Sequence, residues 1–291
     1  MKQRLERHNL LRKLEPLQEE QLAVSLLKFF SPAENEHWLR VLNRPADPGT
    51  MTPLRVFDYL ESMKTIDVDS HRHLSRVLNM TRVLEREGFL EQRGGSQYTA
   101  AFITLFEATS RQLKGTLLLG KALGHAHIAH KFQSSLVHVV GKDAAGDVHG
   151  GTGTLFSNNA ILTCAHVVRD MDVDRELMVT GKRIGVRDIV TNDDDDVAII
   201  FLDDDVVSPL PDLAFRPAHL LENIMICGYP PIARSIEPRP TFHRGEIAAL
   251  DVPTFDRQHV DLFSAIARPG NSGGPCSLSG RTGRRLSVTT T

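Results

Sequence analysis

The spacing of the apolar residues changes near residue 135, and this change constrains the fold more than any other feature of the chain. Before it, runs such as "EEQLAVSLLKFF" place Leu22, Leu26, Leu27 and Phe30 on one face of an amphipathic helix. After it, short β-branched runs such as "SSLVHVVG" and "DVAIIFL" alternate with Gly, Pro and Asn, which is the pattern of strands joined by turns. The chain is therefore expected to have a multidomain fold, an α part followed by an all-β part.

Three regions follow from this pattern. Residues 1–92 are expected to form a helical adaptor or regulatory domain, residues 93–134 a helical connector, and residues 135–291 an all-β domain. A length of 291 residues suits about two domains, each with its own core.

Composition excludes several classes of protein. With 41% apolar residues, 24% charged residues and a net charge of −2, the chain has neither a collagen-like nor a disordered composition. Apolar runs as short as "VAII" and "IMIC" do not span a bilayer, and the charged N-terminus lacks the apolar segment of a signal peptide, so a cytoplasmic protein is predicted. The three cysteines are far apart and show no metal-ligand spacing, so neither a metal nor another cofactor is expected.

Three polar residues of the all-β part are candidates for chemistry because of where they lie. His166 ends the apolar run in "ILTCAHVV", and Asp196 is the last of four aspartates, directly before "VAII". A carboxylate at the edge of a core is unfavourable unless it is paired, and an imidazolium is a fitting partner. The alternation of the following strand indicates Asp196, and not one of the three aspartates before it, as that partner. Ser272 lies in "RPGNSGGP", a composition that is also typical of an ordinary turn.

The order His166, Asp196, Ser272 is that of the chymotrypsin-fold peptidases. The segments "GGTGTLFSNNAILTCAHVV", "DDVAII", "ICGYP", "RGEIAAL" and "RPGNSGGP" resemble successive landmarks of trypsin-like serine peptidases, closest to the compact bacterial and HtrA-type members. This resemblance covers residues 135–280 and implies a chymotrypsin-like double β-barrel. It implies that His166 is the general base, that Asp196 orients it, and that Ser272 is the nucleophile. The backbone N–H groups of Gly270 and Ser272 would form the oxyanion hole.

Two positions depart from the secreted members of this family. Those members have an aspartate before the serine, which pairs with a newly cut N-terminus, whereas this chain has Asn271. Regulation is therefore expected to come from the N-terminal domain instead. The position six residues before the serine, which sets the preference of trypsin for basic residues, is Ile266. An apolar or small residue is expected before the scissile bond.

The sequence after the serine turn is shorter than the family pattern. The segment "LSVTT" is expected to supply the strand that pairs with the substrate, and Leu286 and Val288 are candidates for the substrate pocket together with Ile266. We therefore expect a second barrel that is truncated at its C-terminal end, with an edge that exposes unpaired backbone groups.

The N-terminal domain admits two interpretations. "NLLRKLEPLQEEQLAVSLLKFF" and the helices after it resemble the death-effector-like fold and the effector-associated adaptor domains, which implies a homotypic protein contact through residues 1–92. The alternative is a winged helix in which "RGGSQ" is the wing. Residues 1–100 hold fifteen Lys and Arg against fourteen Asp and Glu, which argues against nucleic-acid binding.

The function that these observations predict is that of a serine endopeptidase acting on a protein or peptide substrate, regulated or recruited by its N-terminal adaptor. The alternatives are a catalytically impaired peptidase fold that serves as a scaffold in a signalling or defence complex, and a winged-helix DNA-binding regulator fused to a peptidase.

Overall fold

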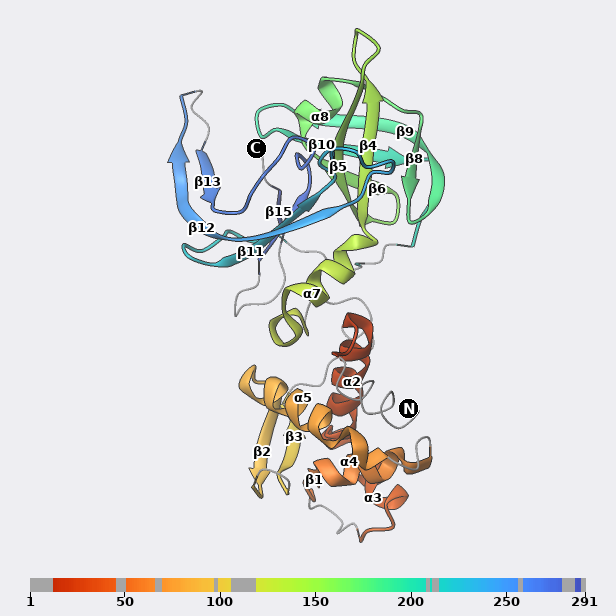
Figure 1. Cartoon of the computed structure of the whole chain (residues 1–291), viewed down its shortest axis with the longest axis vertical. Coiled ribbons are helices and arrows are strands. Elements are labelled where there is room, and N and C mark those ends of the chain that lie inside the picture. The colour runs from red at the N-terminus through yellow and green to blue at the C-terminus, as the bar shows by residue number, and fades with distance from the viewer. Residues whose placement is uncertain are drawn as a thin grey trace. The chain divides into compact units, whose positions relative to one another are not determined.

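The computed structural model of the chain describes residues 13–45, 51–65, 70–96, 99–105, 119–207, 210, 215–255, 259–278 and 286–288. The chain divides into two compact units, residues 1–114 and residues 115–291 (Figure 1). The boundary between the two units falls inside residues 93–134, the segment predicted as a helical connector.

The first unit combines helices with a small sheet. Its elements are α2 (Pro16–Phe29), η1 (Pro32–Glu34), α3 (Asn35–Val41), β1 (Leu54–Arg55), α4 (Val56–Ser62), η2 (Met63–Thr65), η3 (Ser70–His73), α5 (Leu74–Arg86), β2 (Leu90–Gly94) and β3 (Ala101–Thr104). The three strands pair in the order β1-β3-β2. The expectation of a purely helical bundle is corrected by this sheet, whose last two strands form a hairpin after α5.

Aromatic packing holds the core of the first unit together. The ring of Phe29 lies 5.0 Å from that of Trp38 and 5.3 Å from that of Tyr59, and Phe30 lies 5.6 Å from Phe102 on β3. Helix α2 begins at Pro16, a residue suited to the first helical position, and the Gln18 side chain accepts a hydrogen bond from the Glu15 N–H. These contacts bring the helices and the hairpin to one core.

The second unit begins with a helix and continues as two antiparallel sheets. Its elements are α7 (Gly120–Gln133), β4 (Leu136–Lys142), β5 (Val148–Ser157), β6 (Ala160–Thr163), α8 (Ala165–Arg169), β7 (Asp172–Val173), β8 (Glu176–Val179), β9 (Lys182–Asn192), β10 (Val197–Leu202), β11 (Asn223–Gly228), β12 (Thr241–Pro253), β13 (His259–Phe263), β14 (Pro275–Leu278) and β15 (Leu286–Val288). In the described parts of both units, no helix has both the length and the apolar composition needed to cross a bilayer.

The first sheet of this unit has seven strands in the order β7-β4-β5-β6-β10-β9-β8. It curls, because β8 at one end of this order lies beside β4 near the other. The strand β10 shows why: Ala198, Ile200 and Leu202 are buried, while the residues between them are half-buried. The strands turn their apolar faces inward, and together these faces enclose the core of this sheet.

The second sheet has five strands in the order β13-β12-β11-β14-β15. Strand β12 bends along its length (Figure 1), and its pairing with β13 shifts register at two places, as bulges do. The buried side chains of Ile224, Ile226, Ile247 and Cys276 form its core. Strand β15 pairs with β14, so "LSV" forms the last strand of this sheet, and its pairing with a substrate stays a prediction.

Candidate active site

An antiparallel strand pair brings His166 and Asp196 together. Strand β6 ends at Thr163, and β10 begins at Val197, with Thr163 opposite Ala198. Because the strands run in opposite directions, the residues just after β6 and just before β10 lie at the same edge of the sheet. His166 stands on the short helix α8 at this edge, and Asp196 on the turn that enters β10.

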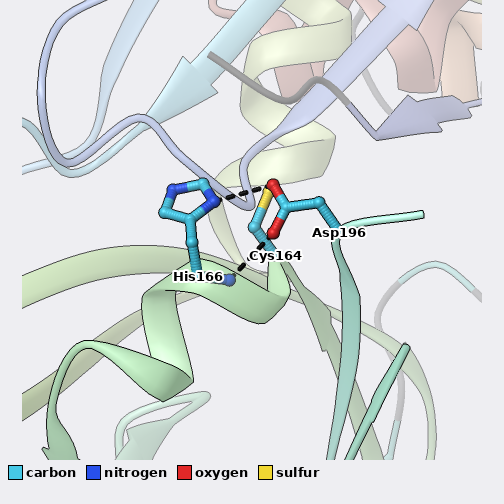
Figure 2. A group of neighbouring side chains, drawn as sticks. All are labelled: Cys164, His166 and Asp196. Carbon is cyan, nitrogen blue, oxygen red and sulfur yellow. Dashed lines mark hydrogen bonds and ion pairs between the residues drawn. The ribbon is translucent and has the colours of Figure 1, made fainter. Parts of the chain in front are cut away.

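Asp196 contacts His166 at two atoms (Figure 2). Its Oδ2 lies 2.7 Å from Nδ1 of the imidazole, and its Oδ1 accepts a 2.8 Å hydrogen bond from the His166 backbone N–H. The Asp196 carbonyl accepts a third bond, of 3.2 Å, from the N–H of Ala165. The first two N–H groups of α8, which have no partner within the helix, are thus both taken by Asp196. This geometry requires a positive φ of 49° at Asp196, which an aspartate tolerates better than most residues.

The contact with Asp196 assigns the tautomer of the imidazole. A carboxylate only accepts hydrogen bonds, so Nδ1 of His166 must carry the hydrogen of the 2.7 Å contact. In the neutral ring the lone pair is then on Nε2, the nitrogen that can take a proton from another group. The His166 and Asp196 side chains are 27% and 18% exposed, so both are partly accessible to solvent.

The three aspartates before Asp196 point elsewhere. All three are exposed. The carboxylate of Asp195 accepts a 2.8 Å hydrogen bond from the Asn192 side chain, and that of Asp193 lies 3.8 Å from Arg169. The structure therefore places Asp196 against His166, as the alternation of β10 predicts.

The turn that holds Ser272 is closed by its own backbone and anchored to β5. The Asn271 N–H donates to the carbonyl of Arg268, and the Gly274 N–H donates to that of Asn271, each at 2.9 Å. The N–H of Thr152 on β5 donates to the Ser272 carbonyl, also at 2.9 Å. Ser272 itself is half-buried. Because β5 pairs with β6, this anchor brings the turn to the part of the fold that carries His166.

Two glycines of the turn are required by its geometry. Gly273 has a φ of +78°, and a Cβ there would lie 2.2 Å from the Thr152 carbonyl oxygen and 3.0 Å from the Cys164 nitrogen. Gly270 has a φ of +91°, and its Cβ would lie 2.6 Å from the carbonyl oxygen of Tyr229. These approaches are possible only without a side chain. The close contact at Gly273 places the residue after Ser272 directly against the strand end that leads to His166.

Cys164 is a member of the site that the sequence did not single out. It is fully buried, and its sulfur lies within 4.8 Å of the Asp196 carboxylate. Burial, and next the charge of Asp196, raise the pKa of the Cys164 thiol to about 12. The thiol therefore lies beside the acid of the His–Asp pair.

Cys164, His166 and Asp196 also form a group of possible metal ligands, whose donor atoms lie within 4.8 Å of one another (Figure 2). A metal would have to displace the proton of the Cys164 thiol, whose pKa burial raises to about 12. The two other side chains are hydrogen-bonded to each other. The group therefore fits a network of hydrogen bonds better than a metal centre.

Asn271 is the residue of the serine turn directly before Ser272 and is buried, with 6% of its surface exposed. Among the residues that the structure describes, neither atom of its side-chain amide has a hydrogen-bond partner. An unpaired buried amide lowers the free energy of unfolding by roughly 1–3 kcal/mol, so Asn271 destabilises the turn by about this amount.

The three predicted pocket residues lie in two places. Ile266 precedes the serine turn and is 60% exposed. Leu286 and Val288 lie on β15, opposite Ser277 and Pro275 of β14. The side chains of Leu286 and Val288 lie outside the described residues, so their contribution to a pocket stays a prediction.

A cleft of about 460 Å³ opens beside the turn. Gly270 and Pro269 form one wall, and the segment Tyr229–Pro231 another. Val148 and Ile236, which are 74% and 100% exposed, lie at its rim. The cleft thus has a partly apolar lining and reaches the serine turn at Pro269 and Gly270.

Residues 151–284 match the model of the family described as trypsin-like peptidase domain. This part of the chain is therefore similar to trypsin-like peptidase domains, and it contains the histidine, aspartate and serine motifs from which such a domain is predicted. A solved structure described as a serine endoprotease from Yersinia pestis matches with 21% identity and a TM-score of 0.41, over 52% of this chain and 52% of that chain. No curated protein matches.

The contacts of Gly273 generate a first prediction. Replacing it with alanine adds a Cβ at a positive φ and against two backbone atoms, so the free energy of unfolding should fall by about 2–5 kcal/mol. Gly146→Ala is the matched control, because Gly146 has a φ of +88° but nothing within 4 Å of the added Cβ. That variant should lose only about 1–2 kcal/mol in urea denaturation. Equal losses would contradict the close approach at Gly273.

The state of Cys164 generates a second prediction. At pH 8 a thiol with a pKa near 12 is ionised to only about one part in 10⁴, and all three cysteines are buried. Iodoacetamide should therefore leave the native protein unmodified and should alkylate all three thiols once urea unfolds it, as intact mass reads directly. Rapid alkylation of Cys164 in the native protein would contradict this and would point to a thiolate in the site.

Proposed function

We propose that the second unit is a serine endopeptidase in which His166, Asp196 and Ser272 form the catalytic triad. The observation that carries the proposal is the 2.7 Å contact between Oδ2 of Asp196 and Nδ1 of His166. It leaves Nε2 as the basic nitrogen of the ring, in a domain whose serine turn is anchored to β5 of the same sheet. A histidine held in this way is the general base that a serine hydroxyl needs.

In this mechanism Nε2 of His166 takes the proton of the Ser272 hydroxyl while Oγ forms a bond to the scissile carbonyl carbon. The N–H groups of Gly270 and Ser272 donate to the oxyanion, a contribution of about 3 kcal/mol for each donor. The C–N bond then breaks, and the amine leaves with the proton from His166. A water molecule, deprotonated by the same nitrogen, hydrolyses the acyl-enzyme and restores Ser272.

The substrate is a protein or peptide segment in extended form. The cleft beside Gly270 has an apolar rim at Val148 and Ile236, which suits apolar side chains of such a segment. Ile266, exposed before the serine turn, and Leu286 and Val288 of β15 are proposed for the pocket on the other side of the scissile bond.

The first unit is proposed to recruit or regulate this peptidase through a protein contact. The hairpin β2–β3 is the feature that the winged-helix interpretation predicts. Two arginines beside this hairpin, however, form ion pairs with glutamates of the same unit. Arg86 lies 2.9 Å from Glu87, and Arg93 lies 2.9 Å from Glu91. Paired cations leave little charge for phosphates, which favours a protein partner over a nucleic acid.

A homotypic contact of the first unit predicts self-association of the full chain. Sedimentation should show a mass that rises with concentration, and mixed-sequence duplex DNA added at 50 mM salt should not change it. A constant monomer mass would contradict the homotypic contact. Salt-dependent binding of the DNA would instead favour the winged-helix regulator.

Covalent labelling tests the peptidase directly. A fluorophosphonate should label the full chain on Ser272, and Ser272→Ala should abolish the label. His166→Ala should slow turnover of a peptide substrate by about 10⁶-fold, and Asp196→Asn should slow it by about 10⁴-fold because the ring loses its correct tautomer.

Asp195→Asn is the matched control for Asp196→Asn, because Asp195 is exposed and bonds only locally to Asn192 in the described part of the chain. It should keep the labelling rate of the unmodified chain. A folded chain that takes no label would overturn the proposal and would favour the alternative of an impaired peptidase fold that serves as a scaffold.

A further inference from the structure

Thr152 on β5 makes four hydrogen bonds at the junction of the two sheets. Its N–H donates to the Ser272 carbonyl at 2.9 Å, and its hydroxyl donates to the Gly270 carbonyl at 2.6 Å. The hydroxyl also accepts from the Tyr229 N–H at 2.8 Å, and the Thr152 carbonyl accepts from the Thr163 hydroxyl at 2.7 Å. Thr152 is fully buried. One residue of the first sheet thus connects to the serine turn, to the end of β11, and to the end of β6.

The direction of the hydroxyl is fixed by its two partners. Tyr229 offers an N–H and must donate, whereas the Gly270 carbonyl can only accept. The hydroxyl hydrogen therefore points to Gly270, and the lone pair points to Tyr229. No rotation of the hydroxyl satisfies both partners in another way.

The restrained partner, Gly270, is a glycine and therefore has more backbone freedom than Asn271 and Ser272 after it. Its φ is +91°, a region that glycine enters as readily as the ordinary one, so nothing in its own chemistry selects this conformation. Thr152 holds the carbonyl of Gly270 and, through its own N–H, that of Ser272. It therefore restrains the backbone on both sides of Asn271, across the two residues whose N–H groups are proposed to bind the oxyanion.

We propose that Thr152 is a positioning residue whose hydroxyl sets the conformation of the oxyanion-binding turn from the neighbouring sheet. The inference rests on the proposed function, since an oxyanion matters only if Ser272 attacks a carbonyl. Donors to an oxyanion are effective only when they are already in place, because reorganising them costs part of their contribution. A hydroxyl that is remote from the substrate but holds the turn should therefore affect the rate of the chemical step.

The neighbouring residue Thr154 shows that burial alone does not account for these contacts. It lies two positions further along β5, on the same face of the strand, and is 2% exposed. Among the described residues its hydroxyl has no hydrogen-bond partner. The two threonines thus lie on the same strand and the same face, and both are buried. They differ in the hydrogen bonds of their hydroxyls, because only the Thr152 hydroxyl has partners among the described residues.

The test compares Thr152→Val, Thr152→Ser and Thr154→Val in the full chain, at a temperature where circular dichroism shows each to be folded. Thr152→Val should slow fluorophosphonate labelling of Ser272, and kcat for a peptide ester, by about 10²-fold or more, with KM changed less than threefold. Thr152→Ser, which keeps the hydroxyl, should stay within about fivefold of the unmodified chain, and Thr154→Val within about twofold.

Labelling of Thr152→Val at the unmodified rate would overturn the proposal. So would equal losses in Thr152→Val and Thr154→Val, because a purely structural role would affect both. If Thr152→Val does not fold, Thr152→Ala replaces it with the same expected loss of rate.

Amide hydrogen exchange gives a readout that does not depend on activity. The N–H groups of Asn271 and Gly274, both bonded within the turn, should exchange at least tenfold faster in Thr152→Val and unchanged in Thr154→Val. If the unmodified chain takes no label, the proposed function fails, and this exchange alone decides the role of Thr152. Unchanged exchange at both positions overturns it.

Discussion

The contacts of Asp196 are the constraint on which the rest of the site depends. Its carboxylate and carbonyl accept three N–H groups, two from the backbone at the start of α8 and one from the His166 ring. The two hydrogen bonds to its charged carboxylate contribute about 1.5–3 kcal/mol each, so this residue fixes both the position of a five-residue helix and the orientation of its histidine. The side chain that precedes β10 thereby decides which nitrogen of His166 is basic.

The serine turn is built onto this arrangement from the other sheet. Close backbone approaches hold it: Gly273 against Thr152 and Cys164, and Gly274 against the carbonyl of Cys227, 2.0 Å from where a Cβ would stand. Thr152 and Cys164 then connect the turn to the strand ends that carry His166 and Asp196. The site is therefore a property of the junction between two sheets, and neither sheet alone positions all three candidate residues.

The sequence predicted the parts of this arrangement that depend on local pattern. The change of periodicity near residue 135, the placement of Asp196 before "VAII", and the glycine turn of Ser272 are each visible in a few neighbouring residues. Thr152 and Cys164 were missed because their partners are distant: the Thr152 hydroxyl bonds a carbonyl 118 residues away, and no local pattern marks it. A threonine between two glycines in "GGTGTLF" was the available signal. The hairpin of the first unit was expected only by the alternative interpretation, since a two-residue β1 and the four-residue β3 give almost no periodicity.

The proposed function of the site depends on Asp196 keeping the hydrogen of the neutral His166 ring on Nδ1, which leaves Nε2 as the basic nitrogen. The direct measurement is the pair of ring ¹⁵N chemical shifts of His166, in protein labelled at its histidines and assigned with His166→Ala, recorded at high enough pH for the ring to be neutral. In the unmodified chain Nδ1 should be protonated and Nε2 unprotonated, and Asp196→Asn should weaken or reverse this preference. A hydrogen on Nε2 in the unmodified chain, or shifts that Asp196→Asn leaves unchanged, would contradict this role of Asp196.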